Sequence, residues 1–443
     1  MRQKICMAGA ALFFIISVFM FSAPDAEAVP AFARQTGLSC NTCHFQHYSS
    51  LNAFGRLFKA GGFTMVGGQS MIEGDMLSMP SALNASMVLK LRYQKTNGDF
   101  YYTKADGSDP SLTKDTDSGR TVVITGDIST NKGELQFPDE AAIFLAGRVG
   151  ENIGFVLEMA LNGENTDNFT SFKMPFVYDF NGTKVSVIPF NTDALGVSFG
   201  FELLNTGAVR NIRTLEHRSQ TSAQQYIGTA TPAEGIAFVA ARDIGFVNYS
   251  LWVPSHTAKD IGPMSQYLRV AATPTFAGWD IGGGLQWWGG TSSVARRDGF
   301  DEDILTSDTD FRTHAWAIDA QAQGEFRSMP LGVYVTYANA EKSESGEPEN
   351  YFNSGTDGDE TALTLVAELG VIPNKAAVSL GYRSADTGAS SSNEDNAITI
   401  GAIYQMAQNV QIQLNHSSMS GNKYDTKPSS GDQLTTLMLF TAF

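Results

Sequence analysis

Beyond residue 80 the chain is a series of segments of about ten residues in which apolar and polar side chains alternate. Four segments show the pattern: LKLRYQ (89–94), FVLEMALN (155–162), WAIDAQAQ (316–323) and VQIQLNH (410–416). In the last of these, one face carries Val410, Ile412 and Leu414, and the other carries Gln411, Gln413 and Asn415. A period of two predicts β-strands that each have one apolar face.

These apolar faces either meet inside a secreted β-sandwich or propeller, or point outward into lipid. No apolar run after the N-terminal region reaches the length of a membrane-spanning helix. The connections alternate between tight turns (VGENIG, ARDIGF, AGWD, VIPNKA, MAQNV) and long polar loops (SSVARRDGFDEDILTSDTD, SESGEPENYFNSGTDGDE, SADTGASSSNEDN). Short turns at one end and long loops at the other are typical of outer-membrane barrels. The sequence therefore predicts an all-β fold, a transmembrane antiparallel β-barrel of about 16 strands, with lipid as its surroundings.

Three further features bear on the barrel. The chain ends in LTTLMLFTAF, in which Leu437, Leu439 and the terminal Phe443 share a face, as in strands that the barrel-insertion machinery recognises. Four tryptophans near segment ends are expected in the aromatic girdles: Trp252, Trp279, Trp287 and Trp288. Residues 204–232 break the order of turns and loops, which suggests a helix or a constriction loop.

The N-terminus has the organisation of an export signal. Arg2 and Lys4 precede an apolar stretch and a small-residue site, which predicts a signal peptide over residues 1–28 with cleavage after Ala28. An uncleaved membrane anchor is the alternative. Cleavage removes Cys6, so the exported chain retains two cysteines, both in one motif.

That motif is Cys40-Asn41-Thr42-Cys43-His44, the attachment signature of a c-type haem. In such a site the thiols of Cys40 and Cys43 form thioethers with the haem vinyl groups, and His44 ligates the iron. A thioredoxin-like pair needs a βαβ context, which is not visible. A zinc site including His47 has suitable atoms, but adjacent ligands at Cys43 and His44 fit a tetrahedron poorly. One covalent haem c is therefore the predicted cofactor.

Residues 29–80 are expected to form a short α-helical cytochrome segment, followed by the barrel over 81–443. Ser49 or Ser50 is expected to cap a helix that ends at Gly61–Gly62. Its apolar stripe would pack against the porphyrin, and Arg56 and Lys59 would meet the propionates; the stripe is Leu51, Phe54, Leu57 and Phe58. A segment this short needs support, so it is expected to plug the barrel or dock on it.

The second axial ligand of the iron stays open at this stage. His47 lies too close to His44 to reach the opposite haem face. The candidates are Met65, Met71, Met76 and Met79, with the barrel histidines His217, His256, His314 and His416 competing only if they point inward. The alternation places His416 on the lipid face.

The residues around the motif resemble a known family. PAFARQTGLSCNTCH followed by LNAFGRLFKAGGFT is similar to the fused monohaem cytochrome–porin family of outer-membrane iron(II) oxidases. The matching positions are Ala33, Arg34, Gln35, Thr36, Gly37, Phe54, Gly55, Arg56, Phe58, Lys59, Gly62 and Thr64. The match covers about residues 30–65 and departs at YSSL and Phe63, where relatives tend to carry proline and tyrosine. The resemblance implies that extracellular Fe(II) gives electrons to the haem, which passes them to a periplasmic c-type cytochrome or another carrier.

The charge of the chain bears on its partners. A formal net charge of −16 disfavours nucleic acid as a partner. Acidic loops are expected to attract the cation, through Asp298, Asp301, Glu302 and Asp303 in one loop and Glu344, Glu347, Glu349, Asp357, Asp359 and Glu360 in another. Alternatives to an iron(II) oxidase are a conduit with another donor or acceptor, or a reversed direction of flow, and a transport porin with a structural haem.

Overall fold

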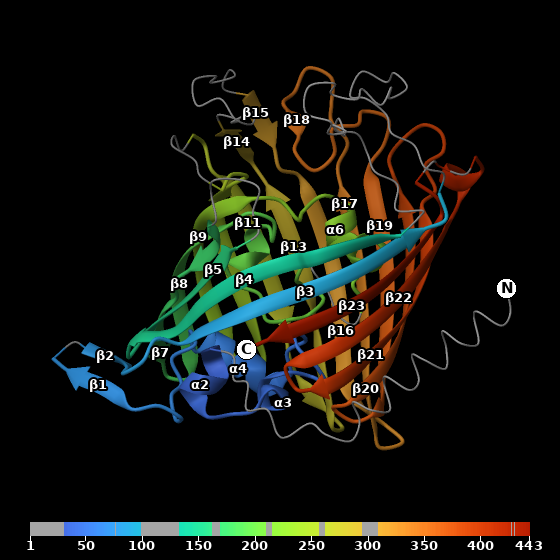
Figure 1. Ribbon diagram of the computed structural model, residues 1–443. Coiled ribbons are helices and arrows are strands. Elements are labelled where there is room, and N and C mark those ends of the chain that lie inside the picture. The colour runs from blue at the N-terminus through green and yellow to red at the C-terminus, as the bar shows by residue number, and fades with distance from the viewer. Residues whose placement is uncertain are drawn as a thin grey trace, which may run out of the picture.

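We describe the fold from a computed structural model, which covers residues 31–75, 77–98, 133–161, 169–209, 215–256, 262–294, 309–426, 428 and 430–443. The predicted signal peptide lies outside these ranges. The described strands form one closed antiparallel barrel in which neighbours along the chain pair, and β23 pairs with β3 to close the ring (Figure 1). The strands are β3 Ala85–Thr96, β4 Glu134–Gly150, β5 Ile153–Ala160, β6 Phe169–Lys173, β7 Phe176–Phe180, β8 Thr183–Thr192, β9 Ala233–Arg242, β10 Gly245–Val253, β11 Ser265–Ala272, β12 Thr275–Phe276, β13 Trp279–Gly289, β16 Ala315–Phe326, β17 Met329–Ala340, β19 Glu360–Ile372, β20 Ala376–Asp386, β21 Asn396–Ala407, β22 Val410–Ser420 and β23 Gln433–Ala442.

Two of these strands are interrupted. β6 and β7 both lie between β5 and β8, and β11 and β12 both pair with β13. Pro175 separates the first pair and Pro274 separates the second. A proline lacks the N–H that a central strand donates, so each strand breaks there. Counting each pair as one strand, the described part of the chain forms a 16-strand barrel, which confirms the predicted fold class.

The alternation of side chains is that of a membrane barrel. In β16, Ala317 and Asp319 are buried in the lumen, whereas Trp316 and Ile318 are 40% and 49% exposed on the outer surface. Gln413 on β22 points inward, as predicted, and Leu414 points outward. An apolar outer surface around a closed ring of strands leaves no backbone group unpaired in lipid. The protein is therefore an outer-membrane β-barrel.

The predicted turns lie together at one end of the barrel, and the two predicted long loops that the structure describes, residues 341–359 and 387–395, lie at the other (Figure 1). At the turn end, Asn181 and Gly182 join β7 to β8 with positive φ at both residues, as a two-residue hairpin requires. At the loop end, a small sheet contains β14 Thr291–Val294, β15 Thr309–Arg312 and β18 Glu349–Asn350. The 3-10 helix η2, Asn422–Tyr424, lies in another connection.

The lumen is filled by the segment between β8 and β9, residues 193–232, which we call the inner segment. It contains η1 Val197–Phe199, α5 Arg218–Thr221 and α6 Ala223–Tyr226, and α5 and α6 pack against β17, β19, β20 and β21. Leu204, Ala223 and Ile227 are buried against inward-facing barrel residues. The prediction of a helix or constriction loop over 204–232 is confirmed.

Two of the four tryptophan placements were wrong. Trp252 and Trp288 are fully buried in the lumen, where both rings pack on Phe352. Trp287 points outward and is 45% exposed. The physical reason is the inner segment, which makes this lumen partly apolar so that large rings are stable inside it.

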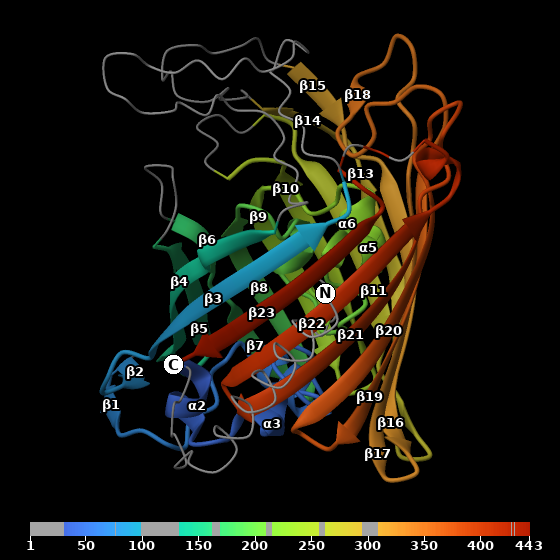
Figure 2. The ribbon, with the colours of Figure 1, turned by 45° about the vertical axis from the view of Figure 1, so that its right-hand side comes forward.

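Residues 31–68 lie in the opening of the barrel at the end that carries the tight turns (Figures 1 and 2). They form α2 Ala31–Thr36, α3 Cys40–Cys43 and α4 Ala53–Ala60, followed by the hairpin of β1 Met71–Gly74 and β2 Leu77–Pro80. We call residues 31–68 the plug. None of the helices in the described ranges is long and apolar enough to cross a membrane.

Candidate functional site

The plug contacts the barrel around much of its circumference. Gln35 is fully buried and accepts hydrogen bonds from the Arg148 backbone N–H on β4, at 2.9 Å, and from Asn84, at 3.3 Å. Two strands away from β4, Phe440 of β23 stacks on the ring of Tyr48 with 5.4 Å between the centroids. These contacts hold the plug from several strands at once.

Three more contacts complete the ring. Arg56 is buried and pairs with Asp280 on β13 at 2.5 Å. The inner segment contributes Asn205, whose side chain accepts from the Leu51 backbone N–H at 2.9 Å and donates to the Leu51 carbonyl at 3.2 Å. Arg56 therefore uses one of its nitrogens for Asp280, and the expectation that it meets a haem propionate stays a prediction.

The Cys-x-x-Cys-His motif lies at the periplasmic surface of the plug. Cys40 and Cys43 open and close the single turn of α3, and both thiols are free and partly exposed. The Cys40 backbone N–H donates to the Gln408 side chain in the turn between β21 and β22, at 3.1 Å. Burial raises the pKa of both thiols, so they are protonated at neutral pH. One helical turn thus presents two free thiols to the turn-end side.

His44 follows the turn in extended conformation. Its Nδ1 lies 3.3 Å from the Ser50 carbonyl oxygen, so an Nδ1–H donates there and Nε2 keeps its lone pair. Burial lowers the pKa of His44 to about 4, and the imidazole is therefore neutral. A neutral ring that is oriented by a backbone carbonyl is the form in which histidine ligates metals. The two thiols and this imidazole fit the donor set of a covalent haem.

α4 packs against α3 without space for a side chain at Gly55. A Cβ at Gly55 would lie 2.1 Å from the Cys43 carbonyl oxygen. The helix begins at Ala53 and is capped by Asn52, which accepts from the Gly55 N–H at 2.9 Å. The predicted caps, Ser49 and Ser50, were therefore wrong, and the predicted end at Gly61 is confirmed.

Substitution Gly55→Ala is expected to destabilise docking of the plug by about 1–3 kcal/mol, because the new methyl group pushes α4 off the motif. Limited proteolysis of folded protein in detergent measures this as faster cleavage within residues 31–68. Ala53→Ser, on the exposed side of the same helix, is the matched control. Equal protection of Gly55→Ala and unsubstituted protein would contradict the packing argument.

The apolar stripe of α4 is divided between two surroundings. Phe58 is buried and packs on Phe32 and Phe63 at 5.1 and 5.7 Å, which forms the aromatic core of the plug. Leu57 is 50% exposed on the other side. Phe58 therefore serves the plug itself and not a porphyrin face.

His47 is held by the barrel wall. Its Nε2 lies 2.8 Å from Glu368 on β19, its Nδ1 lies 2.7 Å from the Tyr48 carbonyl oxygen, and both side chains are fully buried. Burial alone would lower the pKa of His47, but the Glu368 carboxylate raises it above its ordinary value. With both nitrogens engaged, His47 is unsuited to bind iron, as the sequence predicts.

This pair makes docking of the plug depend on pH. The titratable groups around His47 are Glu368, His44 and Tyr334, which lies near Glu368. Because the folded-state pKa of His47 is raised, the stabilisation is complete below the ordinary pKa of about 6.5 and is lost as the pH rises through the raised value. Hydrogen exchange of plug amides is expected to quicken across that range.

Glu368→Gln is expected to remove this pH dependence and to weaken docking by about 1–3 kcal/mol, because the buried charge is lost. The matched control is Glu325→Gln, on an exposed residue near the turn end of β16. A pH profile unchanged by Glu368→Gln would show that another group carries the dependence.

The candidates for the second axial ligand are dispersed. Met65 is exposed in the plug, and Met71 and Met79 lie in the β1–β2 hairpin, on the far side of α2 from α3 in both views (Figures 1 and 2). Met76 lies outside the described residues. The structure brings none of the three described methionines to His44.

The barrel histidines are placed no better for that role. His217 points into the lumen, but its two nitrogens contact Ser417 and Thr436 at 2.6 and 2.8 Å. His314 contacts Arg312 and Glu341 at the loop end. His256 stacks on Phe169, and His416 contacts Thr435 on the outer face, as the alternation predicts.

The acidic loops are only partly described. Asp298, Asp301, Glu302 and Asp303 lie outside the described residues. Glu347 pairs with Arg312 at 2.6 Å, and Asp359 accepts from Asn339 and from the Lys342 backbone. In the described ranges no group of three or more His, Cys, Asp or Glu side chains is arranged to hold a metal ion.

The chain is similar in structure to solved outer-membrane proteins. No protein-family model matches the chain, and no curated protein matches it. One similar solved structure is OmpT of Vibrio cholerae with loop L8 deleted, which is 12% identical with a TM-score of 0.45 over 83% of this chain and 100% of that one. Another is the outer-membrane channel DcaP of Acinetobacter baumannii, which is 11% identical with a TM-score of 0.45 over 82% of this chain and 97% of that one. An anion-selective porin from Comamonas acidovorans is similar at 11% identity and TM-score 0.45, over 82% and 99% of the chains. The cytochrome–porin resemblance stays a prediction, while the strand pairing itself makes this chain a porin-like barrel of the outer membrane.

Proposed function

We propose that this protein transfers electrons at the outer membrane through one covalent haem c. Cys40 and Cys43 would hold the haem by thioethers, and His44 would ligate its iron through Nε2. The observation that carries the proposal is the combination of two free thiols on one helical turn with an adjacent imidazole whose Nδ1 faces the Ser50 carbonyl, at the turn end of an outer-membrane barrel. When bound, the haem accepts and releases one electron at its iron.

The chain's own residues have defined tasks in this proposal. Ser50 holds the imidazole tautomer through its carbonyl, and Gly55 lets α4 support the turn that carries both thiols. Gln408 fixes the first residue of that turn to the barrel. The partly exposed position of α3 suits delivery of electrons to a periplasmic carrier, which needs a short approach to the site.

Extracellular Fe(II) is the donor that the proposal assigns, following the resemblance of residues 30–65. Anaerobic addition of Fe(II) to purified protein tests it, and the absorption spectrum is expected to change to that of the ferrous haem. A haem that dithionite reduces but excess Fe(II) leaves oxidised would remove iron as the donor and leave a conduit with another partner.

Transport is the second candidate, favoured by the 16-strand porin-like architecture itself. In that case the haem would stabilise the plug and would not transfer electrons. Planar-bilayer recordings distinguish the two functions, because a transport porin passes substantial ionic current with its N-terminal segment in place, whereas a dedicated electron carrier does not.

A further inference from the structure

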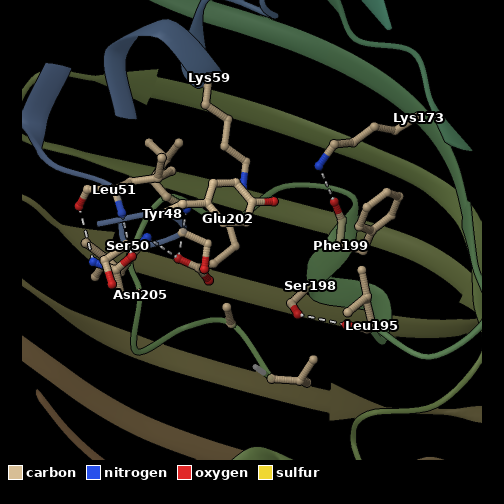
Figure 3. A pocket seen from close by; sticks show the side chains of 15 residues that line it. Tyr48, Ser50, Leu51, Lys59, Lys173, Leu195, Ser198, Phe199, Glu202 and Asn205 are labelled. Carbon is tan, nitrogen blue, oxygen red and sulfur yellow. Dashed lines mark hydrogen bonds between the residues drawn. The ribbon is translucent and has the colours of Figure 1, made fainter. Parts of the chain in front are cut away.

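A cavity of about 280 Å³ lies between the plug and the inner segment. Tyr48, Ser50 and Leu51 line it from the plug side, and η1 and residues 202–205 line it from the lumen side (Figure 3). Two lysines reach it from different elements, Lys59 from α4 and Lys173 from β6. Two lysine side chains that converge on one cavity stay charged only when negative charge lies close to them.

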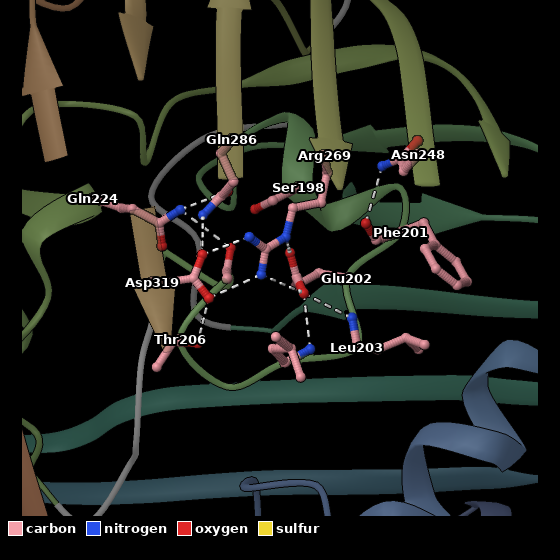
Figure 4. Close-up of polar contacts among 12 residues, drawn as sticks. Ser198, Phe201, Glu202, Leu203, Thr206, Gln224, Asn248, Arg269, Gln286 and Asp319 are labelled. Atoms are coloured by element: carbon pink, nitrogen blue, oxygen red, sulfur yellow. Dashed lines mark hydrogen bonds and ion pairs between the residues drawn. The ribbon is translucent and has the colours of Figure 1, made fainter. Parts of the chain in front are cut away.

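The described lining residues supply little of that charge. Glu202 is the one carboxylate among them, and it is already engaged. Its oxygens bind the guanidinium of Arg269 at 2.9 Å and accept from the backbone N–H groups of Leu203 and Leu204 (Figure 4). Arg269 binds Asp319 as well, so one guanidinium serves two carboxylates and the network keeps one net negative charge, which is one short of what the two lysines require.

The lysines are left with spare donors. Lys173 donates to the Phe199 carbonyl oxygen at 2.9 Å, which uses one of its three N–H groups. The Nζ of Lys59 makes no hydrogen bond or ion pair with the described residues. Burial lowers the pKa of Lys59, and the nearby Glu202 offsets this lowering only in part.

A third group points to a ligand in the same cavity. Ser50 is 2% exposed, and its hydroxyl has no hydrogen-bond partner although the residue lines the cavity. Buried hydroxyl groups without a partner are uncommon because each costs desolvation energy. A hydroxyl donor and two ammonium groups form a donor set suited to an oxyanion.

We propose that the cavity binds an oxyanion, a carboxylate or phosphate group, between Lys59, Lys173 and Ser50. Two sources supply this chemistry, a propionate of the haem assigned under the proposed function or a free anion from the periplasm. Ser50 also holds His44 through its carbonyl, so occupation of the cavity is coupled to the orientation of the axial imidazole. The haem source depends on the proposed function, whereas the free-anion source does not.

Calorimetric titration with inorganic phosphate tests the proposal on the full-length protein in detergent and on its Cys40→Ala/Cys43→Ala variant. The variant, with its plug shown by proteolysis to be docked, is expected to bind phosphate. Lys59→Gln or Lys173→Gln is expected to weaken binding about tenfold or more, since each removes a charge-assisted hydrogen bond. Lys184→Gln, which removes a half-exposed lysine outside the cavity lining, is the matched control.

The two proteins together identify the source of the anion. Phosphate binding to the variant but not to the haem-loaded protein indicates a propionate in the cavity, and binding to both indicates a free oxyanion. Mass spectrometry distinguishes failure of the haem assignment from failure of the anion site. A protein that carries no porphyrin mass but still binds phosphate would contradict the haem assignment and support the anion site. No binding to the docked variant, or binding unaffected by both lysine substitutions, would overturn the proposal.

Discussion

Cys40→Ala/Cys43→Ala protein is expected to reach the outer membrane as a folded barrel that carries no covalent porphyrin. The motif makes few of the contacts that close the barrel, whereas the thioethers require both sulfurs. Intact-mass measurement should show loss of the whole porphyrin mass, and the haem absorption should fall to background. The heat-dependent shift in electrophoretic mobility that reports folded barrels should persist.

Two further variants sharpen this result. Ser39→Ala, at an exposed position directly before α3, is the matched control and should retain the haem. His44→Ala should retain the porphyrin mass but lose the spectrum of an axially ligated iron, because attachment and ligation use different residues. If unsubstituted exported protein carried two free thiols and no added mass, the electron-transfer proposal would fail.

Removal of the plug alone is expected to raise ionic conductance only a little, although removal of the plug together with the inner segment should raise it many-fold. The two segments fill successive parts of the lumen, and a 16-strand barrel without such filling is an aqueous channel. Single-channel recordings compare three proteins: full length, a deletion of residues 29–80, and that deletion with 194–231 replaced by a short glycine-serine turn.

The design of the double variant follows from the register. Thr192 of β8 lies opposite Ala233 of β9, so a short turn can join these strands without changing their pairing. Replacement of 194–231 with the plug retained is the matched control. A large conductance after deletion of 29–80 alone would show that the inner segment does not block the lumen.

The alternating segments were sufficient to predict the barrel because each strand touches lipid on one face and the lumen on the other. That local pattern survives in β16 and β22. It does not reveal what fills the lumen, which explains why Trp252 and Trp288 were misplaced. Their burial depends on Phe352 and the inner segment, distant in sequence.

The candidate site is also only partly predictable from the sequence. Cys40, Cys43 and His44 form a contiguous motif that matches the attachment signature of a c-type haem, so the sequence alone proposes them. The groups that position them do not appear in any local pattern. Glu368 is 321 residues from His47, and Asp280 is 224 residues from Arg56. The sequence does place Glu368 and Asp280 at inward-facing strand positions. This predicts a polar lumen but does not identify the plug residue that each carboxylate binds.

The circumferential anchoring of the plug has a consequence for biogenesis. Residues 31–68 precede every strand of the barrel in the sequence, yet their partners extend from Asn84 to Phe440 on β23, the strand that closes the ring. Seating of the N-terminus must therefore wait until the final strand has joined the first, since contacts of such long range form late in folding. Under the proposed function, a haem-attaching enzyme in the periplasm would meet the thiols of α3 on a segment that the barrel does not yet enclose.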